Sequence, residues 1–222
     1  EGKTVKPMIS SMDHKRAYDN DEGLNTGGMG TIAPNPLYTP DKQQECMEKI
    51  FLPTIKAMAA EGRPFKGCLM LTPNGAKVIE YNCRFGDPET QVVLPLLETD
   101  IMDIIEAVWE EKLDTLDIKW SDKSCACVVM ASGGYPEKYE TGKVISGLDE
   151  NGQCEGAFVY HAGTKLEDGK FLTAGGRVLG ITAYGDTLKE ALDTAYKAVD
   201  TISFEKAHYR HDIGKKALSA LK

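Results

Sequence analysis

The chain has 222 residues, with 26 Lys and Arg against 34 Asp and Glu, so its formal net charge is −8. Apolar residues make up 41% and charged residues 27%, which is ordinary globular usage and excludes a wholly disordered chain. No apolar run approaches the ~20 residues of a membrane span, which excludes a membrane-spanning protein. The acidic charge and the lack of a Lys/Arg-rich stripe argue against a nucleic-acid partner.

The first 35 residues are predicted to hold one strand and a long loop. Thr4–Ser10 alternates enough to be a strand, and Glu1-Gly2 before it is typical of a turn with no preceding strand. Because the chain also does not begin with Met, we expect a fragment of a longer protein. Ser11–Asn35 is polar and glycine-rich, which predicts a loop, and so long a loop in a compact protein is usually functional.

A helix is predicted next. Thr39-Pro40 is typical of an N-cap followed by proline at the first helical position, and apolar residues then recur on one face from Met47 to Met58. Pro53 should bend this helix, and Gly62 should end it.

A hairpin and a second helix complete the first half. Asn74-Gly75 predicts a tight turn between strands at Lys66–Thr72 and Ala76–Cys83. Asp100–Glu111 is predicted to be helical.

A change of pattern at Leu113–Asp122 predicts a boundary between a domain over residues 1–115 and a β-rich domain over residues 120–222. Asn151-Gly152 and Asp168-Gly169 predict turns, and Thr187 with Glu190 predicts a capping box that starts a closing helix. The expected strands are Cys125–Ala131, Lys143–Ile145, Ala157–Ala162, Phe171–Thr173 and Arg177–Tyr184. We therefore expect an α+β fold, in which an antiparallel sheet with helices precedes a small β-rich domain with a packed helix.

Glu80, Asn82 and Arg84 form the first chemically distinctive group. They alternate along the second hairpin strand, so the Glu80 and Asn82 oxygens should share one face. A carboxylate and an amide oxygen suit Mg²⁺, and the Arg84 fork suits a carboxylate or phosphate. The same spacing also fits a solvated strand edge with an Arg–Glu pair.

The second group combines Asp13-His14-Lys15-Arg16 with the glycine-rich run Asn25–Gly30. Glycines let backbone N–H groups approach an anion closely, although a plain flexible turn is the more common explanation of such a run. The spacing matches neither a P-loop nor a dinucleotide fingerprint.

The six cysteines include no CxxC pair, and Cys125-Ala-Cys127 is a weak ligand pair. Six cysteines permit a disulfide framework, but a chain with a normal core does not need one. We expect reduced thiols and a cytoplasmic location.

Motifs spread over nearly the whole chain resemble those of one enzyme family. They are SMDHKR, NTGGMG, EYNCRFGDPETQ, ASGGYPEKYETGKVISGL, HAGT, TAGGRVLGITAYG and YRHDIG. Together they are similar to glycinamide ribonucleotide synthetases, also called phosphoribosylamine–glycine ligases, of the ATP-grasp superfamily. The resemblance implies that residues 1–115 are the second part of an ATP-grasp domain, with the family's N-terminal domain and the first part of the grasp missing.

The resemblance implies a ligase of purine biosynthesis, in which ATP phosphorylates glycine and 5-phosphoribosylamine attacks the resulting acyl phosphate. It implies that Glu80 and Asn82 hold Mg²⁺ or Mn²⁺ beside the ATP phosphates. Residues expected to orient the reacting groups are Arg84, Asp87 and Glu89. Residues expected to line the substrate cleft are Asp13, His14, Lys15, Asn25, Thr26, Gly27, Gly28, Met29 and Gly30.

Because the missing segments should supply most ATP contacts, we expect the fragment alone to be inactive. The alternatives are another ATP-grasp carboxylate–amine ligase, a carboxylase relative that shares the Glu-x-Asn strand, and a non-catalytic binding module. Many ATP-grasp enzymes carry a further metal carboxylate on the preceding strand, and Phe65–Thr72 has no acidic residue here.

Overall fold

The computed structural model describes residues 1–68, 70–73 and 78–221, which form two compact units. Unit 1 comprises Glu1–Ser10, Pro36–Gly86 and Leu97–Ser121. Unit 2 comprises Ser11–Asn35, Asp87–Leu96 and Asp122–Lys222. The chain therefore crosses between the units several times, and one crossing lies at the end of the predicted boundary segment.

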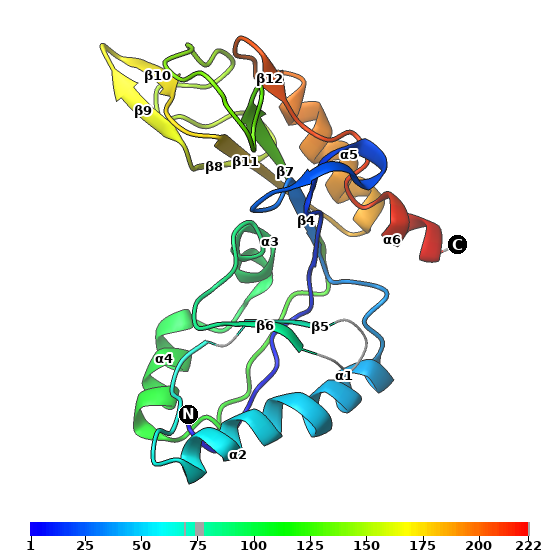
Figure 1. Ribbon diagram of the computed structural model, residues 1–222, viewed down its shortest axis with the longest axis vertical. Helices are drawn as coiled ribbons and strands as arrows, with labels where there is room; N and C mark the ends of the chain where they lie inside the picture. The colour runs from blue at the N-terminus through cyan, green and yellow to red at the C-terminus, as the bar shows by residue number, and fades with distance from the viewer. Residues whose placement is uncertain (69, 74–77, 222) are drawn as a thin grey trace. The chain divides into compact units, whose positions relative to one another are not determined.

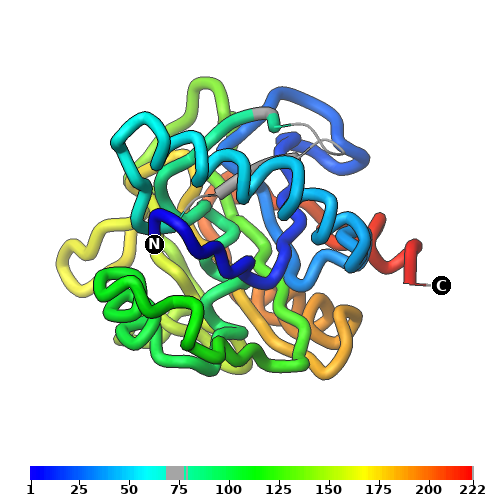
Figure 2. The backbone as a smooth tube through the Cα atoms, turned by 90° about the horizontal axis from the view of Figure 1, so that it is seen from below, coloured from blue at the N-terminus to red at the C-terminus, as the bar shows by residue number. Residues whose placement is uncertain are grey.

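A long helical run forms one part of unit 1, as predicted. It consists of α1 (Pro40–Cys46), the π-helical turn η2 (Met47–Phe51) and α2 (Leu52–Ala60). Pro53 is the second residue of α2, one residue beyond the π-turn, and the wider turn accommodates the ring and the missing N–H of proline. The run ends just before Gly62, whose φ is +72°. Figure 2 shows the N-terminal segment Glu1–Ser10 running beside this helical run.

The hairpin and the second helix of unit 1 also form. The strands β5 (Met70–Pro73) and β6 (Val78–Asn82) pair antiparallel, while the predicted Asn74-Gly75 turn lies outside the described residues. Helix α4 (Ile101–Glu110) begins after Asp100, whose carboxylate accepts the Met102 N–H. The strand predicted at Thr4–Ser10 is wrong, because these residues pair with no described strand.

Unit 2 is built on an antiparallel sheet with the strand order β1-β4-β7-β11-β8 (Figure 1). The strands are β1 (Met12–Asp13), β4 (Gly30–Ala33), β7 (Ser124–Ser132), β8 (Phe158–His161) and β11 (Arg177–Gly185), and β12 (Ala207–His208) also pairs with β7. The strands predicted near residues 125, 157 and 177 are thereby confirmed.

Residues 11–35 are not the loop that was predicted. They contain β1, β4 and a small hairpin of β2 (Arg16–Tyr18) and β3 (Glu22–Asn25), joined by the 3₁₀ turn η1 (Asp19–Asp21). Strand β4 is completely buried and pairs with β7. Because its partner lies far along the chain, local composition did not reveal it.

Smaller elements flank the sheet. Asp168 (φ +49°) and Gly169 (φ +71°) form the predicted turn, which joins β9 (Thr164–Glu167) to β10 (Lys170–Thr173). The strand predicted at Lys143–Ile145 is reduced to a single bridge between Val144 and Leu172. Helical segments α3 (Thr90–Val93), η3 (Leu94–Leu96) and α6 (Lys215–Ala220) complete the unit.

Helix α5 (Leu188–Val199) covers one face of the sheet beside β7 and β11 (Figure 1). The predicted capping box is present, with Thr187 and Glu190 each accepting a backbone N–H of the other. Apolar residues of the helix pack on alternate residues of both strands, and each fully buried aliphatic side chain contributes roughly 1.5–3 kcal/mol. The core residues at this contact are Ala126, Val128, Met130, Leu179, Ile181, Ala183, Leu188, Leu192, Ala195 and Val199.

The expected α+β fold is confirmed. None of the described helices is long and apolar enough to cross a membrane.

Candidate functional site

The site in unit 2 begins with two stretches of backbone that pair with each other. The first is Asp13–Lys15, which we call the site segment, and the second is Thr26–Gly30, which we call the glycine loop. The N–H of His14 donates to Gly30 O at 2.9 Å, the N–H of Met29 donates to His14 O at 2.9 Å, and the N–H of Thr26 donates to Lys15 O at 2.7 Å. The two segments therefore hold each other in register.

The N–H groups of Gly27 and Gly28 in the glycine loop already donate to side chains in this structure. Gly27 N–H donates to the Tyr135 hydroxyl at 3.1 Å, and Gly28 N–H donates to Thr26 Oγ1 at 2.9 Å. These two contacts favour the structural interpretation of the glycine run over an anion cradle in this conformation. Gly28 has a φ of +122°, and a Cβ there would lie 2.6 Å from Asp13 Oδ1 and 2.4 Å from Pro88 Cδ. Glycine is required because the loop backbone lies directly on the Asp13 carboxylate.

Arg177, at the start of β11, joins the glycine loop to the turn that contains Asp87. Its Nη1 donates to Asp87 O at 2.9 Å and to Gly27 O at 3.2 Å, and its Nη2 donates to Asp87 Oδ2 at 2.9 Å. Gln91 Nε2 donates to the other carboxylate oxygen, Asp87 Oδ1, at 2.9 Å. The Arg177 side chain remains partly exposed, so its charge is both positioned and accessible.

Lys15 lies between two carboxylates. It forms an ion pair with Asp13, and its Nζ lies 3.7 Å from Glu89 Oε1. The Asp13 side chain is only 7% exposed, and its Oδ1 accepts no hydrogen bond from a described residue. Burial raises the pKa of Asp13 to about 6 although Lys15 opposes the change. Burial lowers the pKa of Lys15, but Asp13 and Glu89 outweigh it and leave that pKa raised.

Two predicted cleft residues are turned into the protein. Met29 is completely buried. The His14 ring is buried, with one nitrogen 3.1 Å from Gly30 O and the other 3.1 Å from Gly214 N. Gly30 is itself part of β4, where a Cβ would meet Ile213 and the Cys127 carbonyl. These residues hold the site together rather than offer groups to a ligand.

The remaining cleft residues lie at the surface. Asn25 is exposed on β3 opposite Arg16. Thr26 Oγ1 donates to Lys15 O at 2.9 Å, which ties the loop to the site segment a second time.

Unit 1 carries the predicted metal pair and Arg84. Glu80 and Asn82 lie on β6 two residues apart, with Glu80 exposed and Asn82 half-buried. Asn82 Nδ2 is buried and has no hydrogen-bond partner among the described residues. One carboxylate and one amide oxygen fit Mg²⁺, which keeps several waters and takes few protein ligands. The described residues contain no group of three or more His, Cys, Asp or Glu side chains able to hold a metal.

The three residues expected to orient reacting groups belong to different units. Arg84 is exposed in unit 1 and donates to Phe85 O at 2.9 Å. Asp87 and Glu89 belong to unit 2, where they meet Arg177 and Lys15.

Sequence reasoning missed Arg177 and Tyr135 as site residues. Both lie in quoted motifs, TAGGRVLG and ASGGYP, so the resemblance contained the signal. Only tertiary contacts bring them to the glycine loop.

Comparison with known proteins gives one consistent result. Residues 1–90 match the family model of the phosphoribosylglycinamide synthetase ATP-grasp (A) domain, and residues 125–216 match that of the phosphoribosylglycinamide synthetase C domain. A phosphoribosylamine–glycine ligase from Caldanaerobacter subterraneus is 52% identical over 217 residues, which cover 96% of this chain and 51% of that protein. The chain thus spans about half the length of the curated relatives it matches.

Solved structures agree with these relatives. The crystal structure of a phosphoribosylamine–glycine ligase from Thermotoga maritima has a TM-score of 0.82 and 32% identity, over 96% of this chain and 53% of that one. The biotin carboxylase domain of the Hydrogenobacter thermophilus 2-oxoglutarate carboxylase, solved with MgADP and bicarbonate, has a TM-score of 0.52 at 15% identity, over 89% of this chain and 42% of that one. The second likeness shows a shared fold only.

Proposed function

The chain belongs to the phosphoribosylglycinamide synthetase family, and on this premise we propose that it forms part of an ATP-dependent ligase. That ligase would join glycine to 5-phosphoribosylamine through a glycyl phosphate. The chain spans about half of its relatives, so the whole reaction is a proposal for a protein that contains the rest of their length as well. We propose that the 222-residue chain alone does not catalyse it.

The observation that carries this proposal is the pair of cations at the glycine loop. Lys15 is held by Asp13 and Glu89, and Arg177 is held by Asp87 and loop carbonyls. Forming an acyl phosphate and displacing phosphate from it both concentrate negative charge, which prepositioned cations stabilise. Each cation is fixed before substrate arrives, so little reorganisation is required at the reacting carboxylate or phosphate.

Glu80 and Asn82 are proposed to hold Mg²⁺ or Mn²⁺ through the Glu80 carboxylate and the Asn82 amide oxygen. A divalent ion there would neutralise the phosphate oxygens of ATP. Arg84 is proposed to bind a substrate carboxylate or phosphate with its planar fork. No side-chain nucleophile is required, because ATP itself activates the acid. All six cysteines are free, which supports the proposal of a cytoplasmic, reducing location.

A chimera tests the proposal. The matching segment of the Caldanaerobacter ligase is replaced by this chain, and the chimera is expressed in a bacterium that lacks its own phosphoribosylamine–glycine ligase. We expect growth without added purines and glycine-dependent ADP release by the purified chimera. The chain by itself should release no ADP.

The outcome separates the alternatives. A soluble, folded chimera that uses another acid in place of glycine would indicate a different ATP-grasp ligase. A folded chimera that releases no ADP, whichever acid is supplied, would favour a non-catalytic binding module and contradict the proposal.

A further inference from the structure

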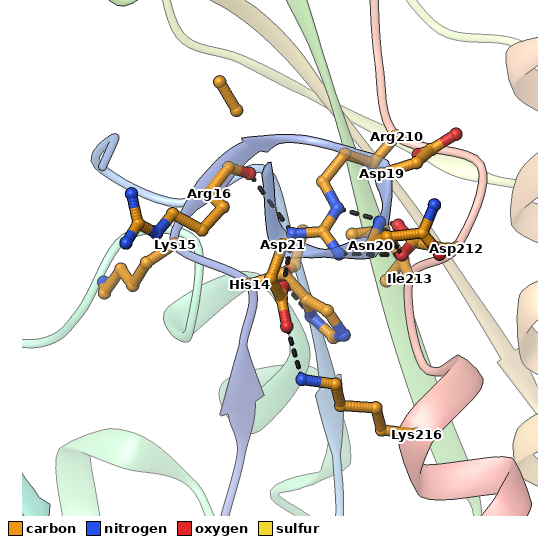
Figure 3. A network of polar contacts seen from close by, with 12 residues as sticks. His14, Lys15, Arg16, Asp19, Asn20, Asp21, Arg210, Asp212, Ile213 and Lys216 are labelled. Atoms are coloured by element: carbon orange, nitrogen blue, oxygen red, sulfur yellow. Dashed lines mark hydrogen bonds and ion pairs between the residues drawn. The ribbon is translucent and has the colours of Figure 1, made fainter. Parts of the chain in front are cut away.

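A buried arginine near the C-terminus is hydrogen-bonded to the chain just after the site segment. Arg210 is 1% exposed, and Figure 3 shows it pointing between Asp21 and Asp212. Its Nε and Nη2 donate to the two Asp212 oxygens at 2.8 and 2.9 Å. Its Nη1 donates to Asp21 Oδ1 at 2.9 Å and to Arg16 O at 3.2 Å. A buried guanidinium requires such complete pairing, so the Arg16 backbone is held in one place.

The same C-terminal segment holds the turn η1. Asn20 and Asp21 have φ values of +59° and +58°, a region that non-glycine residues rarely adopt. Asn20 N–H donates to Asp212 Oδ2 at 2.8 Å, and Lys216 pairs with Asp21. His211 N–H donates to Asp19 Oδ1 at 2.8 Å. Contacts with the C-terminal segment thus offset the unfavourable backbone of this turn.

His14 connects this segment to the site itself. Its Nδ1 lies 3.1 Å from the Gly30 carbonyl, and its Nε2 lies 3.1 Å from the Gly214 N–H. A carbonyl can only accept and an amide N–H can only donate, so the ring must be neutral with its proton on Nδ1. The flanking residues Asp13 and Lys15 are the ones that meet Glu89 and the glycine loop.

We propose that Arg210–Lys216 is a clasp that positions Asp13 and Lys15, and that His14, as a neutral ring donating through Nδ1, is the positioning residue through which it acts. A buried charge network adds little net stability compared with apolar packing of the same shape. We therefore assign this network the role of positioning Asp13 and Lys15. The effect on the reaction rests on the proposed function, whereas the geometry of the clasp does not.

Protonation of His14 would break the contact. A second ring N–H would point at the Gly214 N–H, and the new charge would face Arg210. Asp21 and Asp212 of the same network and the hydrogen bond to the Gly30 carbonyl favour the charged ring, whereas Arg210 opposes it. The neighbouring charged groups Asp13, Lys15 and Lys216 are themselves paired, Asp13 with Lys15 and Lys216 with Asp21. Burial dominates and lowers the pKa of His14.

The first experiment uses the 222-residue chain itself. Ring ¹⁵N shifts of His14, assigned by comparison with His14→Asn, are recorded from pH 5 to 8. We expect the neutral form protonated at Nδ1 at pH 7, and retention of that form below pH 6.5. A ring protonated at Nε2, or charged at pH 7, would overturn the proposal.

The second experiment uses the chimera. His14→Phe keeps the ring volume but removes both hydrogen bonds, and we expect kcat/KM to fall tenfold or more. His14→Asn keeps a donor for Gly30 but cannot reach Gly214, so an intermediate value is expected. His161→Phe is the matched control, because it also removes two ring hydrogen bonds but acts on Thr164 and Gly152. Hydrogen exchange of β7 confirms that each variant is folded.

The results separate the two proposals. If His14→Phe is folded and as active as the unchanged chimera, the clasp has no positioning role and the inference is wrong. If the unchanged chimera is folded but has no ligase activity, the proposed function fails, and the ring shifts still decide whether the clasp exists as described.

Discussion

Replacing Arg210 by methionine should destabilise unit 2 strongly. The substitution removes four hydrogen bonds from a side chain that is 1% exposed, and deprives two carboxylates of the guanidinium that they share. Asp212 is 13% exposed, so its charge is left almost unsolvated, whereas Asp21 is 34% exposed and keeps Lys216. Removing one partner of a buried pair costs about 3–5 kcal/mol, and the exposure of Asp21 places the expected loss near the lower end.

The pKa of Asp212 gives an independent magnitude. Burial acts to raise it, but hydrogen bonds from Arg210 and Asn20 outweigh burial and lower the pKa from 3.8 to about 2. That difference corresponds to about 2 kcal/mol of stability, present above pH 3.8 and lost as the pH falls through about 2. The charge–charge part of the expected loss should therefore disappear in strong acid.

Hydrogen exchange measured by mass spectrometry on β7 and α5 peptides reports the free energy of unfolding of unit 2 alone. We expect a loss of about 3 kcal/mol for Arg210→Met at pH 7. Arg210→Lys should lose about half as much, because an ammonium keeps the charge without the fork. The double variant Arg210→Met with Asp212→Leu should recover part of the loss. A loss below about 1 kcal/mol for Arg210→Met would refute the reasoning.

Four further predictions concern the two site groups. In the chimera, Glu80→Gln should lower turnover at ordinary Mg²⁺ and recover partly at raised Mg²⁺, whereas the exposed control Glu106→Gln should change neither; full activity of Glu80→Gln at low Mg²⁺ would contradict the metal role. Arg177→Lys should raise the KM of a substrate at least roughly tenfold because the fork to Asp87 and the loop is lost, and unchanged steady-state kinetics would remove it from the site. Gly28→Ala should cost roughly 1–3 kcal/mol by hydrogen exchange, since its Cβ meets Pro88 and Asp13, and a neutral result would show that the loop relaxes freely. In the chain itself, the raised pKa of Asp13 means that the folded state holds an extra proton between pH 3.8 and about 6. The free energy of unfolding should therefore fall by up to about 3 kcal/mol as the pH rises through that window. Asp13→Asn should abolish this fall, and a pH profile that the substitution leaves unchanged would refute the assignment.

The titration of His14 changes the free energy of unfolding in the opposite direction over part of the same pH range. Its pKa is lowered, so the unfolded ring takes up a proton below pH 6.5 while the folded ring does not, and stability is lost as pH falls. The Asp13→Asn comparison is needed because it removes only one of these two opposing contributions.

Local chemistry determined much of the fold in advance. The Thr187–Glu190 capping box, the proline at the first position of α1 and the Asp168-Gly169 turn each depend on residues within four positions of one another. Such features are readable from sequence because the groups that satisfy each other are neighbours in the chain. The placement of Glu80 and Asn82 on one strand was predictable for the same reason.

Tertiary structure alone decided how the site is assembled. Strand β4 is a strand because β7 supplies its hydrogen bonds, and Arg177 becomes a site residue because it reaches Asp87 and Gly27. His14 was expected at a ligand, but Gly30 and Gly214 occupy both its nitrogens. In each case the hydrogen-bonding partner lies tens to hundreds of residues away, so composition and periodicity around the residue could not specify which partner it would find.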